Sequence, residues 1–569
     1  MAMGMAMAMV QTVLDEMRDS RCAGDKAIRS VLDQGSGDDG RRSGWPRQAS
    51  ASLFGFSLCC LAVPVQAESW QITPTIAVNE TLTNNLFLTS TNKTSDLVTA
   101  ITPGISIDGK GGRASLRLSY GFTQQLYARE SSQNNHQNSL SAIGSLEAIE
   151  NWLFIDATGT ISQQYISAFG QTSQSIANVN NNQTETSYYS ISPHIKGTFL
   201  SSAEYLLRYR AAITRSDSAY SGSTNSVAVN ANALSSQGDL NSSEWLGTLS
   251  GNTRWSGLGW GLEASRLTND YTGGRNYEDT RYQAGLNYRF NPQFRVSAFA
   301  GQESQNYVSV NQETHTTHGF GFVWAPGPRT ELSANNTYRF FGNSYDINFR
   351  HRMARSLITY TASRSISSQP AGVGSTGQGS NYDATYAIIA ANNPGASPDA
   401  IRSQVSQVLQ GRGVPADGAV VNGYLTNRPT LQQLQQLSFA LLGVRNTVTL
   451  NVNETKQQPL GLANGATDDY SLANEITQRG FAIIWGHQLS GLSSLSLSLN
   501  QSRSISQRAG QFDNRTQGAY LLLTTQISPK TSASVGARHV NYDGGSISST
   551  GLGSSYTESA LTGSLSHSF

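Results

Sequence analysis

Apolar side chains fall on every second position through most of the chain between Trp70 and Phe569. In the stretch RASLRLSYGFTQQLYAR, Leu116 and Leu118 lie on one face of an extended chain, whereas Arg117 and Ser119 lie on the other. The stretches EYLLRYRAAIT, RYQAGLNYRF, FRVSAFA and SSLSLSLNQS repeat this period of two, which predicts β-strands. The longest runs exceed the roughly 5–6 residues of a typical soluble strand. They match membrane strands of about 9–11 residues with overhangs.

The connections between these runs alternate between short and long. Short connections are GKGG at Gly109, NPQ at Asn291, APGPR at Ala325, GVRN at Gly443 and SPKT at Ser528. The long connections, such as residues 167–185 and 215–241, are polar and rich in Asn and Ser. Short periplasmic turns with long extracellular loops are typical of outer-membrane barrels. The sequence therefore predicts an all-β fold, a transmembrane antiparallel β-barrel of the outer-membrane type. We expect about 22 strands, within a range of about 20–24, because bacterial single-chain barrels have even strand numbers.

The chain ends on the alternating stretch TESALTGSLSHSF, so its last residue, Phe569, stands at the end of a predicted strand. A closed barrel leaves no free edge, and we therefore expect this strand to pair with the strand near Trp70. The terminal Phe569 also resembles the C-terminal signal that outer-membrane assembly machinery reads. That machinery and the outer-membrane lipid are the partners expected first.

Aromatic residues are concentrated near the ends of the predicted strands. That position favours girdles at the two membrane interfaces, with ordinary core aromatics as the alternative. The residues concerned are Trp152, Phe199, Trp245, Trp255, Trp260, Phe290, Phe294, Trp324 and Phe340.

The period of two lapses at about residues 367–428. The stretch SPDAIRSQVSQVLQGRG predicts a short helix with Ser397 as its N-cap and an apolar stripe of Ile401, Val405, Val408 and Leu409. We expect this partly helical insertion to fold over or into the extracellular mouth and restrict the pore, with a disordered surface insert as the alternative. Helix and strand compete over residues 431–437, where the alternation that follows favours a strand.

The region before the barrel carries no strand pattern. Residues 1–40 are interpreted as a non-structural extension. Residues 41–67 are interpreted as a signal peptide, with a basic start, an apolar run from Leu53 to Val63 and cleavage after Ala67; a buried helix is the alternative. Residues 68–569 then form the barrel, located in the outer membrane of a Gram-negative cell. Because the strand pattern begins within a few residues of Glu68, we expect no N-terminal plug domain.

Charge is sparse in this chain, at 14% of residues with a net charge of +1, which argues against a nucleic-acid partner. The strand phase points a set of charged residues into the lumen. One interpretation is a network of ion pairs that holds the strands in register; the other is a conduit whose excess of Arg favours anionic solutes. The set comprises Arg117, Arg208, Arg210, Arg254, Arg289, Arg295, Arg339, Arg350, Asp156, Glu263, Glu331 and Asp346.

Motifs for catalysis, nucleotide binding or metal binding do not stand out, and we expect no enzyme activity, no cofactor and no metal. His315 and His318 are three residues apart on a predicted strand, so their side chains point to opposite faces, a poor arrangement for chelation. The Asn-rich stretch at Asn178 is interpreted as a solvated loop rather than a sugar site.

The chain resembles the outer-membrane barrels associated with the PEP-CTERM/exosortase system of Gram-negative bacteria. The resemblance lies in WQITPTIAVNETLTNN, in PGISIDGKGGRASLRLSYGFTQQLY, in GYLTNR with the following QQLSFALLGVRNTVTL, and in the terminal Phe569. It implies a channel or accessory in exopolysaccharide export or envelope protein sorting, with polysaccharide or secretion components as partners. An adhesive or structural surface barrel is the alternative function, ahead of an outer-membrane hydrolase.

Overall fold

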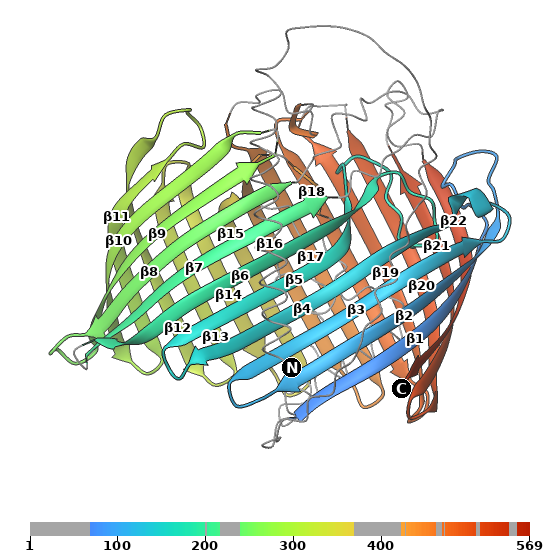
Figure 1. Cartoon of the computed structure of the whole chain (residues 1–569), viewed down its shortest axis with the longest axis horizontal. Helices are drawn as coiled ribbons and strands as arrows, with labels where there is room; N and C mark the ends of the chain where they lie inside the picture. Colours follow the sequence, from blue (N-terminus) through green and yellow to red (C-terminus); the bar gives the residue numbers. More distant parts are fainter. Residues whose placement is uncertain are drawn as a thin grey trace, which may run out of the picture.

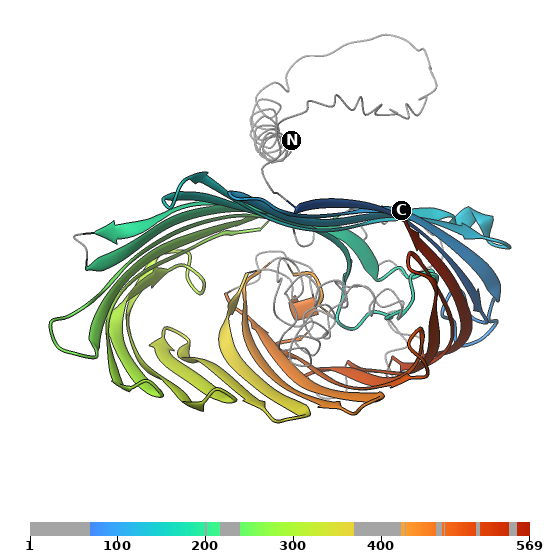
Figure 2. The same ribbon diagram turned by 90° about the horizontal axis from the view of Figure 1, so that it is seen from below.

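The computed structural model describes residues 69–199, 202–216, 239–272, 274–368, 423–426, 428–461, 469–471, 473–507, 512–544 and 555–569. These residues form one sheet of 22 antiparallel strands, each hydrogen-bonded to the strands before and after it in the sequence. β1 also pairs with β22, from Thr75 opposite Ser568 to Thr83 opposite Ala560, so the sheet closes into a barrel. Figures 1 and 2 show this barrel from the side and from below, where its outline is oval. The predicted fold and strand number are confirmed.

The strands of the first half are β1 (Ser69–Thr83), β2 (Asp96–Lys110), β3 (Ala114–Tyr127), β4 (Asn135–Ile149), β5 (Leu153–Tyr165), β6 (Gln183–Phe199), β7 (Ala203–Ser216), β8 (Leu240–Asn252), β9 (Leu258–Tyr271), β10 (Asn276–Asn291) and β11 (Phe294–Gln305). Those of the second half are β12 (Glu313–Gly327), β13 (Thr330–Arg339), β14 (Gly342–Arg352), β15 (Ser356–Ser367), β16 (Thr430–Leu442), β17 (Asn446–Pro459), β18 (Ile476–Gln488), β19 (Ser493–Ser506), β20 (Asp513–Ser528), β21 (Thr531–Asp543) and β22 (Tyr556–Ser568). Two short 3₁₀ helices are η1 (Ser131–Gln133) and η2 (Asp469–Ser471). No helix among the described residues is long and apolar enough to cross a membrane.

The predicted short turns all lie at one end of the barrel, which also holds the start of β1 and the chain end (Figure 1). The connections at the other end are mostly longer, although Phe340 and Phe341 alone join β13 to β14. Short turns mark the periplasmic end of outer-membrane barrels, so the last strand descends toward the periplasm. β15 pairs directly with β16, so the strands on either side of the predicted insertion are neighbours in the barrel. Residues 431–437 lie in β16, and the choice of strand there is confirmed.

The outer face of the barrel is apolar over its middle. Leu262, Tyr282 and Leu286 are exposed and occupy alternate positions on β9 and β10. Leu499 and Leu521 repeat this arrangement on β19 and β20. Such a surface is costly in water, at about 25 cal/mol per Å², and is suited to lipid.

Most of the predicted girdle residues are also exposed near strand ends, among them Trp152, Phe199, Phe290 and Trp324, whereas the exposed Trp245 lies in the middle of β8. Phe340 differs from this expectation. Its ring stacks on the buried Tyr307 with 5.9 Å between centroids, because the short β13–β14 turn directs it against a cluster of buried aromatic side chains.

The closing strand ends with few contacts for its terminal residue. The Phe569 backbone N–H donates to the Pro74 carbonyl at 2.9 Å, and its ring packs on His567 with 4.8 Å between centroids, yet 62% of Phe569 is exposed.

We expect deletion of Phe569 to lower the outer-membrane level of the protein far more than its folded stability, because so few folded contacts are lost. The measurements are heat-modifiable gel mobility and outer-membrane abundance, with Phe569→Tyr as the conservative control. Equal assembly of the deletion and the Tyr variant would contradict the proposed role of Phe569 as an assembly signal.

Candidate functional site in the barrel lumen

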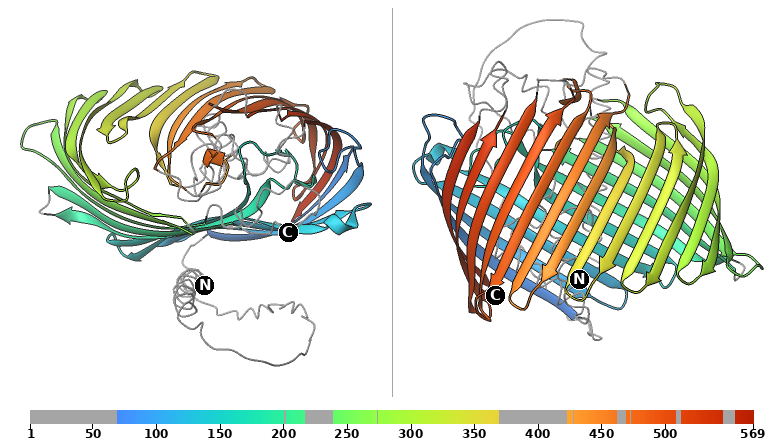
Figure 3. Two further views of the ribbon diagram at one scale, coloured as in Figure 1. Left: turned by 90° about the horizontal axis from the view of Figure 1, so that it is seen from above. Right: turned by 180° about the vertical axis from the view of Figure 1, so that it is seen from behind.

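The connection between β5 and β6, residues 166–182, folds into the barrel. Figures 2 and 3 show this teal segment leaving the wall and entering the lumen. Its base is closed like a hairpin, because Tyr165 pairs with Gln183 and the Ile166 N–H donates to the Asn182 carbonyl at 3.0 Å. We name residues 166–182 the inner loop.

The tip of the inner loop reaches the wall formed by β19 to β22. Tyr542 and Tyr556 donate their hydroxyl hydrogens to the carbonyls of Gly170 and Thr172, at 3.2 and 2.6 Å. Asn500 of β19 donates to the Gln174 side chain at 3.1 Å. Strands far from β5 in the barrel therefore hold the loop, which crosses part of the lumen.

One glycine permits the fold of the loop and a second permits its close approach to the wall. A Cβ at Gly170 would lie 2.3 Å from the Asn182 side chain, which itself donates to the Ser167 and Gln171 carbonyls within the loop. A Cβ at Gly518 in β20 would lie 2.9 Å from the Gln174 side chain. A side chain at Gly170 would therefore disturb the fold of the loop itself, and one at Gly518 would crowd its contact with the wall.

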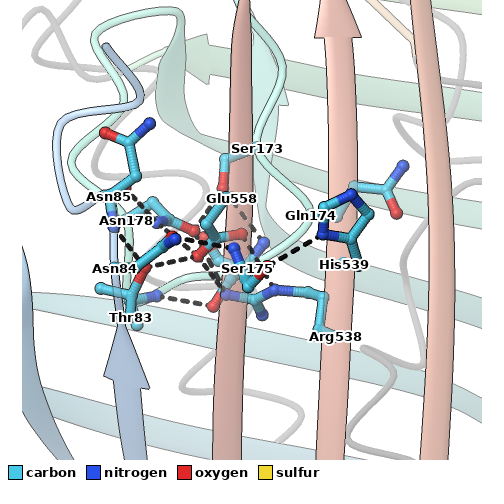
Figure 4. Close-up of polar contacts among 12 residues, drawn as sticks. Thr83, Asn84, Asn85, Ser173, Gln174, Ser175, Asn178, Arg538, His539 and Glu558 are labelled. Atoms are coloured by element: carbon cyan, nitrogen blue, oxygen red, sulfur yellow. Dashed lines mark hydrogen bonds and ion pairs between the residues drawn. The ribbon is translucent and has the colours of Figure 1, made fainter. Parts of the chain in front are cut away.

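A buried ion pair anchors the loop where the barrel closes. Figure 4 shows Arg538 of β21, Glu558 of β22 and Asn178 of the inner loop in contact. Arg538 donates two hydrogen bonds to the Glu558 carboxylate, at 3.1 and 2.7 Å, and the Asn178 amide donates a third at 3.0 Å. Thr83 of β1 adds a hydroxyl donor at 2.7 Å. One carboxylate thus joins β1, β21, β22 and the inner loop.

Asn178 corrects the interpretation of its stretch as a solvated loop. Only 6% of Asn178 is exposed, and its amide also donates to the Asn85 carbonyl at 3.3 Å. The physical reason is that the polar side chains of the inner loop find hydrogen-bonding partners on the equally polar inner wall.

The end of the long β15–β16 connection meets the base of the inner loop. Tyr424 forms a parallel bridge with Tyr165, and the Leu425 N–H donates to the Tyr165 carbonyl at 3.0 Å. Asp469 of η2 accepts hydrogen bonds from the Ser167 hydroxyl and the Ala168 N–H, at 2.7 and 2.6 Å. β5 and β16 are far apart around the barrel, so these contacts join opposite walls across the lumen.

The helix and the apolar stripe predicted at Ile401, Val405, Val408 and Leu409 lie outside the described residues, and their pore-restricting role stays a prediction.

Strand pairing places the predicted lumen residues on the inner face. On β10, Tyr282 and Leu286 face outward, so the odd-numbered positions, including Arg289, face inward. Residues directly opposite each other on paired strands point to the same face, so the pairing shows which positions on the other strands point inward. These inward positions include Arg117, Asp156, Arg208, Arg210, Glu263, Arg295, Glu331, Arg339, Asp346 and Arg350. Arg254 differs: it lies in the β8–β9 turn beyond the strand end, where alternation no longer fixes a side.

Several of these residues form ion pairs between neighbouring strands. Arg208 and Arg210 lie 3.6 and 2.8 Å from the Glu244 carboxylate. Arg117 lies 3.7 Å from Asp108, and Asp156 lies 3.4 Å from His194. These contacts fit the interpretation of the charges as a network between strands.

The most buried of these pairs lies near the extracellular end, in the cluster of Arg339, Glu303 and Asp279. Arg339 of β13 donates to Glu303 of β11, with Nε 3.1 Å from one carboxylate oxygen, and to Asp279 of β10 at 3.3 Å. All three side chains are at most 6% exposed. Close by, Tyr307 stacks on Tyr277 at 5.8 Å, and burial raises the pKa of the Tyr307 hydroxyl. Sequence reasoning identified Arg339 but neither of its partners.

His315 and His318 lie on β12, opposite Glu303 and Ala300 respectively. Their positions differ by three residues, so they occupy opposite faces of the strand, as expected from the spacing.

Comparisons with known proteins concern the barrel as a whole. No protein-family model matches the sequence, and no curated protein matches it. Among solved structures, the chain is similar to the siderophore receptor PirA from Acinetobacter baumannii, at 10% identity and a TM-score of 0.42, covering 88% of this chain and 80% of that one. It is also similar to OccK2 (OpdF) from Pseudomonas aeruginosa, at 8% identity and a TM-score of 0.32, covering 88% of this chain and 98% of that one. These similarities extend to the barrel fold alone.

Proposed function

We propose that this protein is an outer-membrane channel whose lumen is narrowed by the inner loop, and that it serves exopolysaccharide export or envelope protein sorting. The observation that carries the proposal is a closed 22-stranded barrel with an apolar outer face and a charged inner wall. Barrels of this size enclose a lumen too wide for wall side chains alone to fill, and their lumens are plugged in outer-membrane transporters. The resemblance of the sequence to barrels of the PEP-CTERM/exosortase system supports the export role.

The path that we propose runs along the inner wall from β7 to β14. The described contacts of the inner loop with the wall lie on β19 to β22 and on β3, where Gln125 donates to the Ile176 carbonyl at 3.0 Å. The loop also contacts the β1–β2 connection, where Gln171 donates to the Leu88 carbonyl at 2.6 Å. The wall from β7 to β14 instead carries Arg208, Arg289 and Arg350 on its inner face. We assign no catalytic step to this wall.

An adhesive or structural barrel is the second candidate, and one feature of the extracellular end favours it. The aromatic side chains of Tyr271, Tyr277 and Tyr307 pack together with Leu460 of the β17–β18 connection. A Cβ at Gly461 would lie 2.3 Å from the Tyr307 carbonyl, so two loops from different sides of the mouth are in close contact. Loops tied in this way present a fixed extracellular surface.

Single-channel recording in a planar bilayer distinguishes these candidates. We expect the refolded protein to form steady, ion-conducting channels. A folded barrel, verified by heat-modifiable mobility, that never conducts would overturn the channel proposal in favour of the adhesive or structural role.

A further inference from the structure

The periplasmic rim between β8 and β17 contains many arginines and almost no acid. The strand ends and turns within residues 249–261, 286–297, 321–333, 347–359 and 439–449 contain a single acidic residue, Glu331. The same segments contain eight arginines: Arg254, Arg289, Arg295, Arg329, Arg350, Arg352, Arg355 and Arg445. We name these eight residues the arginine rim.

The guanidinium groups of the arginine rim are accessible. All are exposed except Arg352, which is partly exposed. Within the part of the chain that the structure describes, none of the eight takes part in an ion pair. Arg289 and Arg295 even stand directly opposite each other on β10 and β11. Like charges in this position destabilise a sheet, so the rim tolerates a repulsion that a bound anion would relieve.

The periplasmic rim on the other side of the barrel is different. Residues 106–118, 145–157 and 195–207, at the ends of β2 to β7, contain five acidic and four basic residues. Several of these are paired, including Arg113 with Glu150 at 2.6 Å and Arg117 with Asp108 at 3.7 Å. The excess of arginine is therefore a property of one sector and not of periplasmic turns in general.

The direction of the strand arginines indicates where a ligand would lie. Arg289, Arg295 and Arg350 occupy inward positions, while their neighbours Tyr288 and Phe290 are exposed on the outward face. Phospholipid headgroups contact the outward face, so these three arginines favour a ligand within the mouth of the lumen.

The length of the rim indicates the size of the ligand. From the β8–β9 turn to the β16–β17 turn the sheet advances by eight strands, about 40 Å at roughly 4.8 Å per strand. A small anion would contact one or two of these arginines. A chain with repeated negative charges would contact many at once, and such multivalent contacts raise the overall affinity without any single strong site.

We propose that the arginine rim binds a carboxylated polysaccharide chain at the periplasmic mouth of the lumen. This inference rests on the proposed export function and specifies its substrate class as a polyanionic polysaccharide. Binding would be electrostatic, and therefore weakened by salt, because the guanidinium groups are solvent-exposed.

The test measures binding of fluorescent oligogalacturonate, a carboxylated polysaccharide, to the full-length protein in neutral detergent, with neutral dextran as the comparison ligand. The triple variant Arg289→Gln, Arg295→Gln, Arg350→Gln should bind oligogalacturonate about tenfold more weakly, the loss expected for three exposed charge contacts. The matched control is Arg266→Gln, Arg479→Gln, Arg503→Gln, which removes three exposed arginines from the outward face near the extracellular end. This control should bind like the unaltered protein.

Each outcome decides a separate question. Equal binding by the triple variant and the unaltered protein, or equal binding of dextran and oligogalacturonate, would overturn the inference. Competition by phosphatidylglycerol vesicles that equals competition by unlabelled oligogalacturonate would also overturn it, in favour of a lipid site. If the protein conducts but does not bind oligogalacturonate, the inference about its substrate fails and the channel proposal stands. If it binds oligogalacturonate but does not conduct, the arginine rim is a binding site and the channel proposal fails.

Discussion

Replacing residues 167–181 with a two-residue Asn-Gly turn should raise single-channel conductance several-fold while leaving the barrel folded. The inner loop occupies the lumen beside β19 to β22, so its removal opens a second path for ions. The deletion is structurally feasible because Tyr165 already pairs with Gln183, and an Asn-Gly turn suits two strands at that separation. Recording in planar bilayers checks the conductance, and heat-modifiable mobility checks the fold.

A matched variant distinguishes the effect of deleting the inner loop from the effect of losing the hydrogen bond that anchors it. Asn178→Ala deletes the hydrogen bond from the inner loop to Glu558 and keeps the loop length. We expect frequent switching between conductance levels in this variant, because the anchor is weakened by about 1.5–3 kcal/mol, the usual contribution of a hydrogen bond to a charged group. If the shortened loop and the unaltered protein conduct equally, the inner loop does not limit the channel.

The sequence predicts the barrel well because the relevant signal is local. Alternation along each strand depends on which face meets lipid, and it needs no knowledge of partners. The same reasoning placed Arg289 and Arg350 on the inner face. It failed for Arg254, where the strand ends two residues earlier, at Asn252.

The inner loop was not predictable in this way. Its many Ser, Asn and Gln side chains indicate a solvated loop, whereas in the structure several of them form hydrogen bonds with an inner wall that is also polar. The partners of the loop are distant in sequence, as Asn178 and Glu558 illustrate with a separation of 380 residues. One local signal was present: the consecutive Ala168 and Phe169 are apolar, and Phe169 is buried against Phe512 with 4.8 Å between ring centroids.

The buried cluster of Arg339 shows that the partners of an ion pair are equally hard to predict from the sequence. Strand phase points Arg339 inward, but Glu303 and Asp279 reach it only because β10, β11, β12 and β13 adopt one particular stagger. Alternation fixes the face of a strand and leaves its stagger against the neighbours open. The arginine of the pair was therefore predictable and its partners were not.

Arg339→Met should destabilise the barrel by about 3–5 kcal/mol, the usual cost of removing one partner from a buried ion pair. The substitution leaves the carboxylates of Glu303 and Asp279 buried without their shared cation, and Arg281, 3.5 Å from Asp279, compensates only in part. The matched control is the pair of Arg266, which is exposed, and Glu278, which is partly exposed, and Arg266→Met should cost at most about 1 kcal/mol. Urea unfolding of the refolded protein in detergent measures both.

The cause of this loss of stability can be tested by also replacing the two carboxylates that Arg339→Met leaves without a cation. In the triple variant Arg339→Met, Glu303→Gln, Asp279→Asn, no unpaired buried charge remains, so we expect recovery of at least half of the lost free energy of unfolding. Amides of similar shape keep the packing of the cluster while removing the cost of desolvating two negative charges. A triple variant no more stable than Arg339→Met would show that the guanidinium acts through its packing, for example on the ring of Phe341 at 5.0 Å, and not through its charge.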